Sequence, residues 1–263
     1  MYSTIRIETD NGFGTGFFFQ YCYEDKFIPV ILTNWHVVEN SKTGKFLLHS
    51  AMKHDNSIPG QEVFKINMDK FESRWIRHPD PSVDLCAFPV NFIIEGSKKI
   101  GKFPFVIFLT ENEIPSQLDL QEMDAVEDIL MAGYPIGLSD TFNNLPLLRK
   151  GITASHPAVD FDNDSIGVID SACFPGSSGS PIILYNVNKQ DKTGKLIFGE
   201  MKFFLLGLLS QSHSMEVNGI INITPISLNV KPIPVIEVMT NLGFYVKSKE
   251  IMKLKEIIKN TLI

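Results

Sequence analysis

Short apolar runs alternate with turn-forming residues along most of this chain. Eight runs rich in Phe, Ile, Val and Leu stand out: GTGFFFQYCY (14–23), FIPVILTNW (27–35), VDLCAFPV (83–90), ILMAGYP (129–135), SIGVIDSAC (165–173), SPIILYNV (180–187), LLGLLS (205–210) and LGFYVK (242–247). Runs of this length, bounded by Gly, Pro, Asn and Asp, are typical of β-strands joined by tight connections. The pattern therefore predicts an all-β protein, built as a sandwich or a pair of barrels.

A helical period of apolar residues occurs only near the end of the sequence. Ile251, Leu254, Ile258 and Leu262 would share one face of a helix that has Ser248 as its N-cap. The polar segment 111–128 falls near the middle of the chain and is the best candidate for a connection between two halves. We predict an N-terminal barrel over 1–115, a C-terminal barrel over 116–245 and a closing helix over 246–263.

Composition and charge exclude several classes of function. A chain of 263 residues with 44% hydrophobic residues can bury a substantial core. Its net charge of -6 argues against a nucleic-acid partner, because phosphate binding needs clustered Lys and Arg. The longest apolar run, 203–209, is too short to cross a bilayer, so we expect no membrane partner.

Cysteine usage and the N-terminus indicate the compartment. The first residues show no apolar stretch of signal-peptide length. Cys22, Cys86 and Cys173 are odd in number and lack the C-x-x-C spacing of a metal site. We expect reduced, buried thiols and a cytoplasmic location.

The segment FPGSSGSPIIL (174–184) places small residues around adjacent serines. A serine hydroxyl becomes a nucleophile only with a general base in reach, a group that orients the base, and backbone donors for the developing oxyanion. Gly176 can adopt a backbone conformation closed to other residues. The N–H groups of Gly176 and Ser178 could then form an oxyanion hole.

These residues resemble chymotrypsin-fold serine proteases. The nucleophile segment DSACFPGSSGSPI, the strands GFGTGFFF and FIPVILTNWHVV, and the strand VDLCAFPV match the family's motifs in order. The pattern is closest to the bacterial high-temperature-requirement proteases and glutamyl endopeptidases. The resemblance implies two six-stranded antiparallel β-barrels with a C-terminal α-helix, and no metal or organic cofactor. It assigns His36 as general base, Asp84 as the orienting carboxylate and Ser178 as nucleophile.

Neighbouring residues compete for these roles and are less favoured. Asp80 lies in an apparent exposed turn, whereas Asp84 leads into an apolar strand. Ser177 occupies the variable position before the nucleophile, and Cys173 lies five residues before it. The remaining histidines lack the strand-end context and are expected on the surface or in loops: His49, His54, His78, His156 and His213.

The resemblance also implies where a peptide would bind. Ala172 would floor the pocket for the residue before the cut bond, with Ser210 and Gly243 in its walls. Because Ala172 carries no charge, cleavage after Arg or Lys is disfavoured, and apolar residues are preferred over acidic ones. His213 could instead hold an acidic side chain, as a pocket histidine does in glutamyl endopeptidases. Gln211 and Ser212 would line the substrate strand.

Two other classes of function stay open. The chain could be a protease-fold module that binds peptides as an added strand without cutting them. It could also be latent until a regulatory protein partner orders the loop around Pro175, because Ser177 replaces the activating Asp of digestive members. Fluorophosphonate labelling of Ser178 distinguishes the alternatives.

Overall fold

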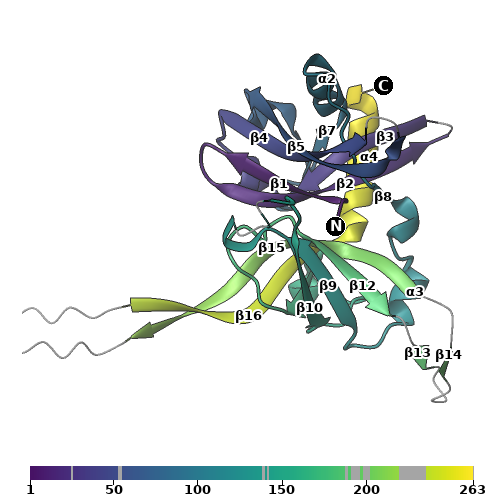
Figure 1. Cartoon of the computed structure of the whole chain (residues 1–263). Helices are drawn as coiled ribbons and strands as arrows, with labels where there is room; N and C mark the ends of the chain where they lie inside the picture. Colours follow the sequence, from purple (N-terminus) through teal and green to yellow (C-terminus); the bar gives the residue numbers. More distant parts are fainter. Residues whose placement is uncertain are drawn as a thin grey trace, which may run out of the picture.

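The computed structural model has two β-rich halves and a helix that packs between them (Figure 1). It describes residues 1–24, 26–52, 55–137, 140, 142–186, 189–190, 196–197, 202–218 and 235–262. The predicted all-β class with a C-terminal helix is confirmed. Each of the eight apolar runs contains a strand or part of one.

The N-terminal half is one eight-stranded sheet. Its path is β5-β4-β1-β2-β3-β7-β6, and β8 pairs parallel to β2. The count therefore exceeds the six expected for this half. The strands are β1 (Thr4–Thr9), β2 (Phe13–Tyr23), β3 (Lys26–Thr33), β4 (Thr43–Met52), β5 (Asp55–Asp69), β6 (Ile76–Arg77), β7 (Cys86–Pro89) and β8 (Leu109–Thr110).

The C-terminal half is a closed six-stranded barrel in the order β10-β11-β16-β15-β12-β9. Closure removes the unpaired edges that an open sheet would present. A separate pair, β13 (Lys189–Gln190) and β14 (Leu196–Ile197), lies outside the barrel. The barrel strands are β9 (Asp128–Gly133), β10 (Leu147–Thr153), β11 (Ile166–Asp170), β12 (Pro181–Asn186), β15 (Lys202–Asn218) and β16 (Val235–Lys247).

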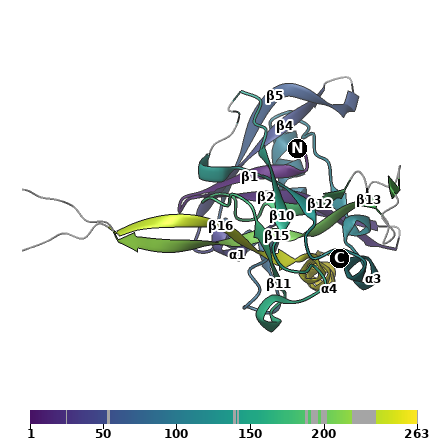
Figure 2. The same cartoon turned by 90° about the horizontal axis from the view of Figure 1, so that it is seen from below.

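Strands β15 and β16 extend beyond the barrel as a two-stranded ribbon. They stay paired out to Asn218 and Val235, and Figures 1 and 2 both show the ribbon projecting from the rest of the molecule. The same β15 begins inside the barrel, where Pro181 of β12 pairs with Leu208. One strand therefore connects the barrel to the ribbon.

The helix α4 (Ser248–Leu262) begins at the serine expected to start it. Ile251, Leu254 and Ile258 are fully buried, whereas Leu262 at the end of the same face is exposed. Their cluster includes Tyr21 from the N-terminal half and residues of the barrel. Burying this apolar stripe joins α4 to both halves.

Three further α-helices occur in the described part of the chain, although helical spacing was found only near its end. They are α1 (Trp35–Val38), α2 (Asn91–Lys99) and α3 (Gln117–Gln121). They are too short for a helical period to emerge from the sequence. The last lies in the segment predicted to connect the halves, and the predicted domain boundaries stay a prediction.

Candidate active site

His36 and Asp84 lie together on the N-terminal half. His36 sits in α1, directly after β3, and Asp84 comes two residues before β7, which pairs with β3. Their side chains meet with His36 Nδ1 2.6 Å from Asp84 Oδ2, and the His36 backbone N–H donates to Asp84 Oδ1 at 3.1 Å. The Asn34 amide donates to the Asp84 carbonyl at 2.8 Å and holds the segment in place. Two contacts to one carboxylate fix the imidazole orientation.

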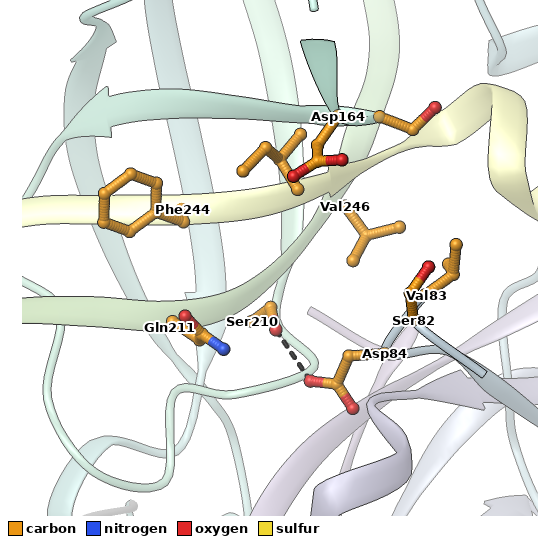
Figure 3. A pocket seen from close by; sticks show the side chains of 10 residues that line it. Ser82, Val83, Asp84, Asp164, Ser210, Gln211, Phe244 and Val246 are labelled. Atoms are coloured by element: carbon orange, nitrogen blue, oxygen red, sulfur yellow. Dashed lines mark hydrogen bonds between the residues drawn. The ribbon is translucent and has the colours of Figure 1, made fainter. Parts of the chain in front are cut away.

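Ser210 approaches the same carboxylate from the barrel. Its hydroxyl donates to Asp84 Oδ2 at 2.7 Å, as Figure 3 shows. Burial acts to raise the pKa of Asp84, but the hydrogen bonds from His36 and Ser210 outweigh it and lower the pKa below its ordinary value. Asp84 is therefore a carboxylate at neutral pH and joins the two halves.

Ser178 lies in the tight loop between β11 and β12. Its hydroxyl donates to the Ser210 carbonyl at 3.4 Å, and the hydrogen bonds of the described residues include none between Ser178 and His36. The loop itself is held by its backbone: the Thr15 N–H donates to the Ser178 carbonyl at 2.9 Å and the Gly179 N–H to the Leu209 carbonyl at 2.8 Å. Ser210 thus links the predicted serine to the predicted carboxylate, and the carboxylate in turn contacts the predicted base.

The peptide between Pro175 and Gly176 has a defined orientation. The Pro175 carbonyl accepts a hydrogen bond from the Ile136 N–H at 2.5 Å. No cis peptide occurs in the described chain, so the Gly176 N–H points in the opposite direction. Gly176 has φ +89°, and a side chain there would meet the Phe13 ring and the Tyr134 carbonyl. The N–H groups of Gly176 and Ser178 find no acceptor among the described residues.

Thr15 fixes this loop from the N-terminal half. Its buried hydroxyl donates to the Gly176 carbonyl at 2.9 Å and accepts from the Tyr134 N–H at 3.0 Å. The Thr33 hydroxyl in turn donates to the Thr15 carbonyl at 2.6 Å. Thr15 therefore connects the nucleophile loop, β9 and β3 through one side chain and its backbone.

Comparisons with known proteins identify the family of the chain. The family model described as "Trypsin-like peptidase domain" matches residues 14–188, more than half of the chain. The chain belongs to the trypsin-like peptidase domain family. One similar solved structure is that of a thermostable serine protease, AL20, from an extremophilic microorganism, with 12% identity and a TM-score of 0.45 over 97% of this chain and 95% of that one. A search of curated proteins finds no match.

The predicted resemblance to chymotrypsin-fold serine proteases is thus confirmed at the level of family and fold. Its closeness to high-temperature-requirement proteases or glutamyl endopeptidases stays a prediction. Among the described residues, no three His, Cys, Asp or Glu side chains gather as metal ligands would. No helix in that part of the chain is long and apolar enough to cross a membrane.

The predicted peptide-binding residues occupy neighbouring strands in this trypsin-like domain. Gln211 and Ser212 of β15 are exposed and pair with Phe244 and Gly243 of β16. A side chain at Gly243 would overlap the Cys173 sulfur, so only glycine leaves that space open. His213 belongs to β15, but its side chain lies outside the described part of the structure.

Arg149 is a charged neighbour that the sequence interpretation missed. Its guanidinium donates to the Ala172 carbonyl and lies over the Phe174 ring, 4.7 Å from the centroid. A cation beside the predicted pocket floor disfavours a second cation there. Arg149 comes from β10, and only the closed barrel brings it near residue 172.

Two predicted placements were wrong. His49 was expected on the surface or in a loop but lies half-buried within β4. His78 lies in the loop after β6, as expected, but it is buried there, with Nε2 3.3 Å from the fully buried Glu250 carboxylate in α4. Both positions depend on contacts with distant elements, which sequence context does not show. Cys86 and Cys173 are buried free thiols as expected, but Cys22 is exposed. Alternation along β2 points its side chain away from the core. His54 lies outside the described residues.

Proposed function

We propose that this trypsin-like domain is a serine endopeptidase. The observation that carries the proposal is the chain of hydrogen bonds that links Ser178 through Ser210 and Asp84 to His36. Beside it lie two backbone N–H groups that have no described acceptor. Nucleophile, base, orienting group and oxyanion donors are the four components that acyl transfer requires.

The proposed reaction proceeds in two steps. Ser178 Oγ attacks the peptide carbonyl carbon while His36 accepts the hydroxyl proton, and the N–H groups of Gly176 and Ser178 stabilise the oxyanion. His36 then gives the proton to the leaving amine as the C–N bond breaks. Water, deprotonated by His36, hydrolyses the acyl-enzyme and restores the Ser178 hydroxyl. Asp84 holds the imidazole tautomer and stabilises the imidazolium.

Substrate binding would bring Ser178 into its reactive orientation. The hydroxyl now faces the Ser210 carbonyl, the same group that would receive the N–H of a bound peptide strand. A peptide that occupies this acceptor leaves His36 as the partner of Ser178. Catalytic hydrogen bonds are often long in unliganded enzymes and shorten in the substrate complex.

The surroundings of Ala172 support a preference for one class of substrate residue directly before the cut bond. The pocket floor carries no carboxylate, and Arg149 adds a positive charge beside it. We propose apolar residues as the preferred class, acidic residues next and basic residues last.

A fluorophosphonate probe tests the proposal. The wild-type protein should become labelled at Ser178, and Ser178→Ala should abolish the label. His36→Ala should lose nearly all turnover, on the order of a million-fold. Ser177→Ala is the matched control, since it removes the adjacent buried hydroxyl and should leave labelling intact.

Each other outcome of the labelling experiment indicates a different nucleophile or a different function. Label retained in Ser178→Ala would mean that another residue is the nucleophile. A wild-type protein that never labels but binds peptides is a binding module, and labelling only after addition of a partner indicates a latent enzyme.

A further inference from the structure

A cavity of about 270 Å³ lies beside Asp84 and Ser210, where the two halves meet (Figure 3). One wall comes from the segment 82–84 of the N-terminal half. The others come from the start of β11 and from β15 and β16. Its volume is enough for one long side chain and too small for a folded partner.

The lining is mixed, with four apolar side chains, several polar ones and one available carboxylate. Val83, Ile166, Phe244 and Val246 supply the apolar part. The Asp164 side chain also lines the cavity, and its carboxylate has no hydrogen bond or ion pair to a described residue. The Asp84 carboxylate, by contrast, is already bonded to His36 and Ser210.

Among the residues that the structure describes, no cationic side chain lines this cavity. Two lysines are close in sequence to its β16 wall, but Lys247 and Lys249 both pair with Asp160. The Asp164 carboxylate therefore has no cationic partner among the described residues, and apolar side chains lie in the same cavity. Lys and Arg fit such a site, because their methylene stems pack on apolar surface while the charged end reaches a carboxylate.

The cavity is continuous with the proposed substrate strand. Ser210 and Gln211 line it and also begin the stretch of β15 that would pair with a peptide. Side chains alternate along an extended peptide. If the residue before the cut bond points toward Ala172, the second and fourth residues before the bond point to the opposite side, where segment 82–84 lies.

We propose that this cavity binds a Lys or Arg side chain of the substrate, at the second or fourth position before the cut bond, and that Asp164 determines the selection. The inference rests on the proposed peptidase function. It adds a substrate class: polypeptides in which a basic residue shortly precedes an apolar cleavage position.

Peptides that differ in one side chain test this site. One scaffold carries lysine, norleucine or glutamate at the second, third or fourth position before the cut bond. Norleucine keeps the lysine stem and lacks the ammonium. In the wild-type protein, lysine at the second or fourth position should raise kcat/KM about threefold to tenfold over norleucine, because a partly exposed ion pair contributes modestly. Added salt should reduce the difference.

Variants then assign the effect to Asp164. Asp164→Asn should remove the lysine preference, so that the lysine and norleucine peptides are cleaved with similar kcat/KM. Asp162→Asn is the matched control, because it makes the same charge change at an exposed residue that does not line the cavity. Asp164→Lys should reverse the preference toward glutamate.

Equal rates for lysine and norleucine in the wild type, a preference that survives Asp164→Asn, or a preference at the third position would each overturn the assignment. Binding of the same peptides to Ser178→Ala, measured by fluorescence anisotropy, separates this inference from the proposed function. If the variant prefers lysine peptides in binding but the wild-type protein cleaves none of them, the proposed peptidase function is refuted and the proposed binding site is supported.

Discussion

The Thr15 hydroxyl connects the two halves of the molecule at the nucleophile loop. It bonds the carbonyl of Gly176 and the N–H of Tyr134, while the Thr15 backbone N–H bonds the carbonyl of Ser178. Digestive relatives use an Asp before the nucleophile to hold this loop, and here that position is Ser177. The Thr15 network therefore supplies a constitutive support for the peptide units that carry the proposed oxyanion donors.

Replacing Thr15 by valine keeps the shape and removes both side-chain hydrogen bonds. Two buried backbone groups would lose their partner, which costs about 1–3 kcal/mol of stability. We expect kcat to fall about tenfold to a hundredfold with KM little changed, because the donors act on the transition state. Steady-state kinetics and the rate of fluorophosphonate labelling measure this.

Thr15→Ser is the control for the hydroxyl. It should restore most of kcat, since it keeps the group that bonds Gly176 and Tyr134. If the serine variant were as slow as the valine variant, the methyl group rather than the hydroxyl would matter.

The three thiols differ in accessibility. Burial raises the pKa of Cys173 to about 11 and that of Cys86 well above its ordinary value, so both stay protonated at neutral pH. Cys22 is exposed. Iodoacetamide should therefore modify Cys22 alone in the native protein, as read by peptide mass spectrometry, without loss of labelling at Ser178. Modification of Cys173 before unfolding would contradict this prediction.

Dithiothreitol should leave the melting temperature unchanged, because the three cysteines are free thiols.

At the residue scale, local sequence signals select the candidate triad. His36, Asp84 and Ser178 are marked by a strand end, a strand start and a glycine-rich loop, and in the structure hydrogen bonds run from Ser178 to Ser210, from Ser210 to Asp84 and from Asp84 to His36. Their catalytic roles stay a prediction. Thr15 was missed because its partner Gly176 is 161 residues away, and nothing local distinguishes it from other small strand residues. Arg149 was missed for the same reason.

Among the elements, α4 joins the two halves. Its three fully buried apolar residues share a cluster with Tyr21, and the Tyr21 hydroxyl donates to the Ile251 carbonyl at 2.8 Å. A second link is the buried pair of Glu250 with His78, in the segment that leads to Asp84. The helix thus supports the strands that carry the site without contributing a reacting group.

Truncating one buried side chain of α4 tests this support. Leu254→Ala should lower the free energy of unfolding by about 2–5 kcal/mol, through lost burial and the cavity left behind. Asn260→Ala, at an exposed position of the same helix, should change it by less than about 0.5 kcal/mol. Urea denaturation measures both, and equal effects would show that the helix is not part of the core.

Some elements were predicted from the sequence and others were missed. The eight strands were found because each is a compact apolar run bounded by turn-forming residues, and the tail helix because its apolar residues recur at helical spacing. The β4–β5 hairpin is more polar, and its alternation is interrupted by register shifts near Ala51. α2 has only Ile93 and Ser97 buried, and no side-chain cap marks its start. Such elements depend on tertiary packing.

Across the whole molecule, Asp84 contributes to the junction of the halves through an ionisable group. Its lowered pKa means that the folded state holds the carboxylate more strongly than the unfolded chain does. Its contribution to stability is present above the ordinary carboxyl pKa and is lost as pH falls through the lower folded value.

Asp84→Asn should therefore be less stable than wild type at neutral pH, and the difference should shrink in acid as the wild type loses this contribution. Thermal unfolding from neutral pH to about pH 3 measures the two curves. A difference that stayed constant over this range would show that the charge of Asp84 does not stabilise the fold.

Because α4 follows all the strands in the sequence, it is synthesised and packs last. A chain made from its N-terminus completes β1 to β16 before α4, so both halves exist during synthesis without the helix that packs between them. The halves that carry Ser178 and His36 then lack the support of α4. Under the proposed function, a nascent chain would therefore cleave its own exposed segments and neighbouring unfinished chains poorly until the helix emerges and packs.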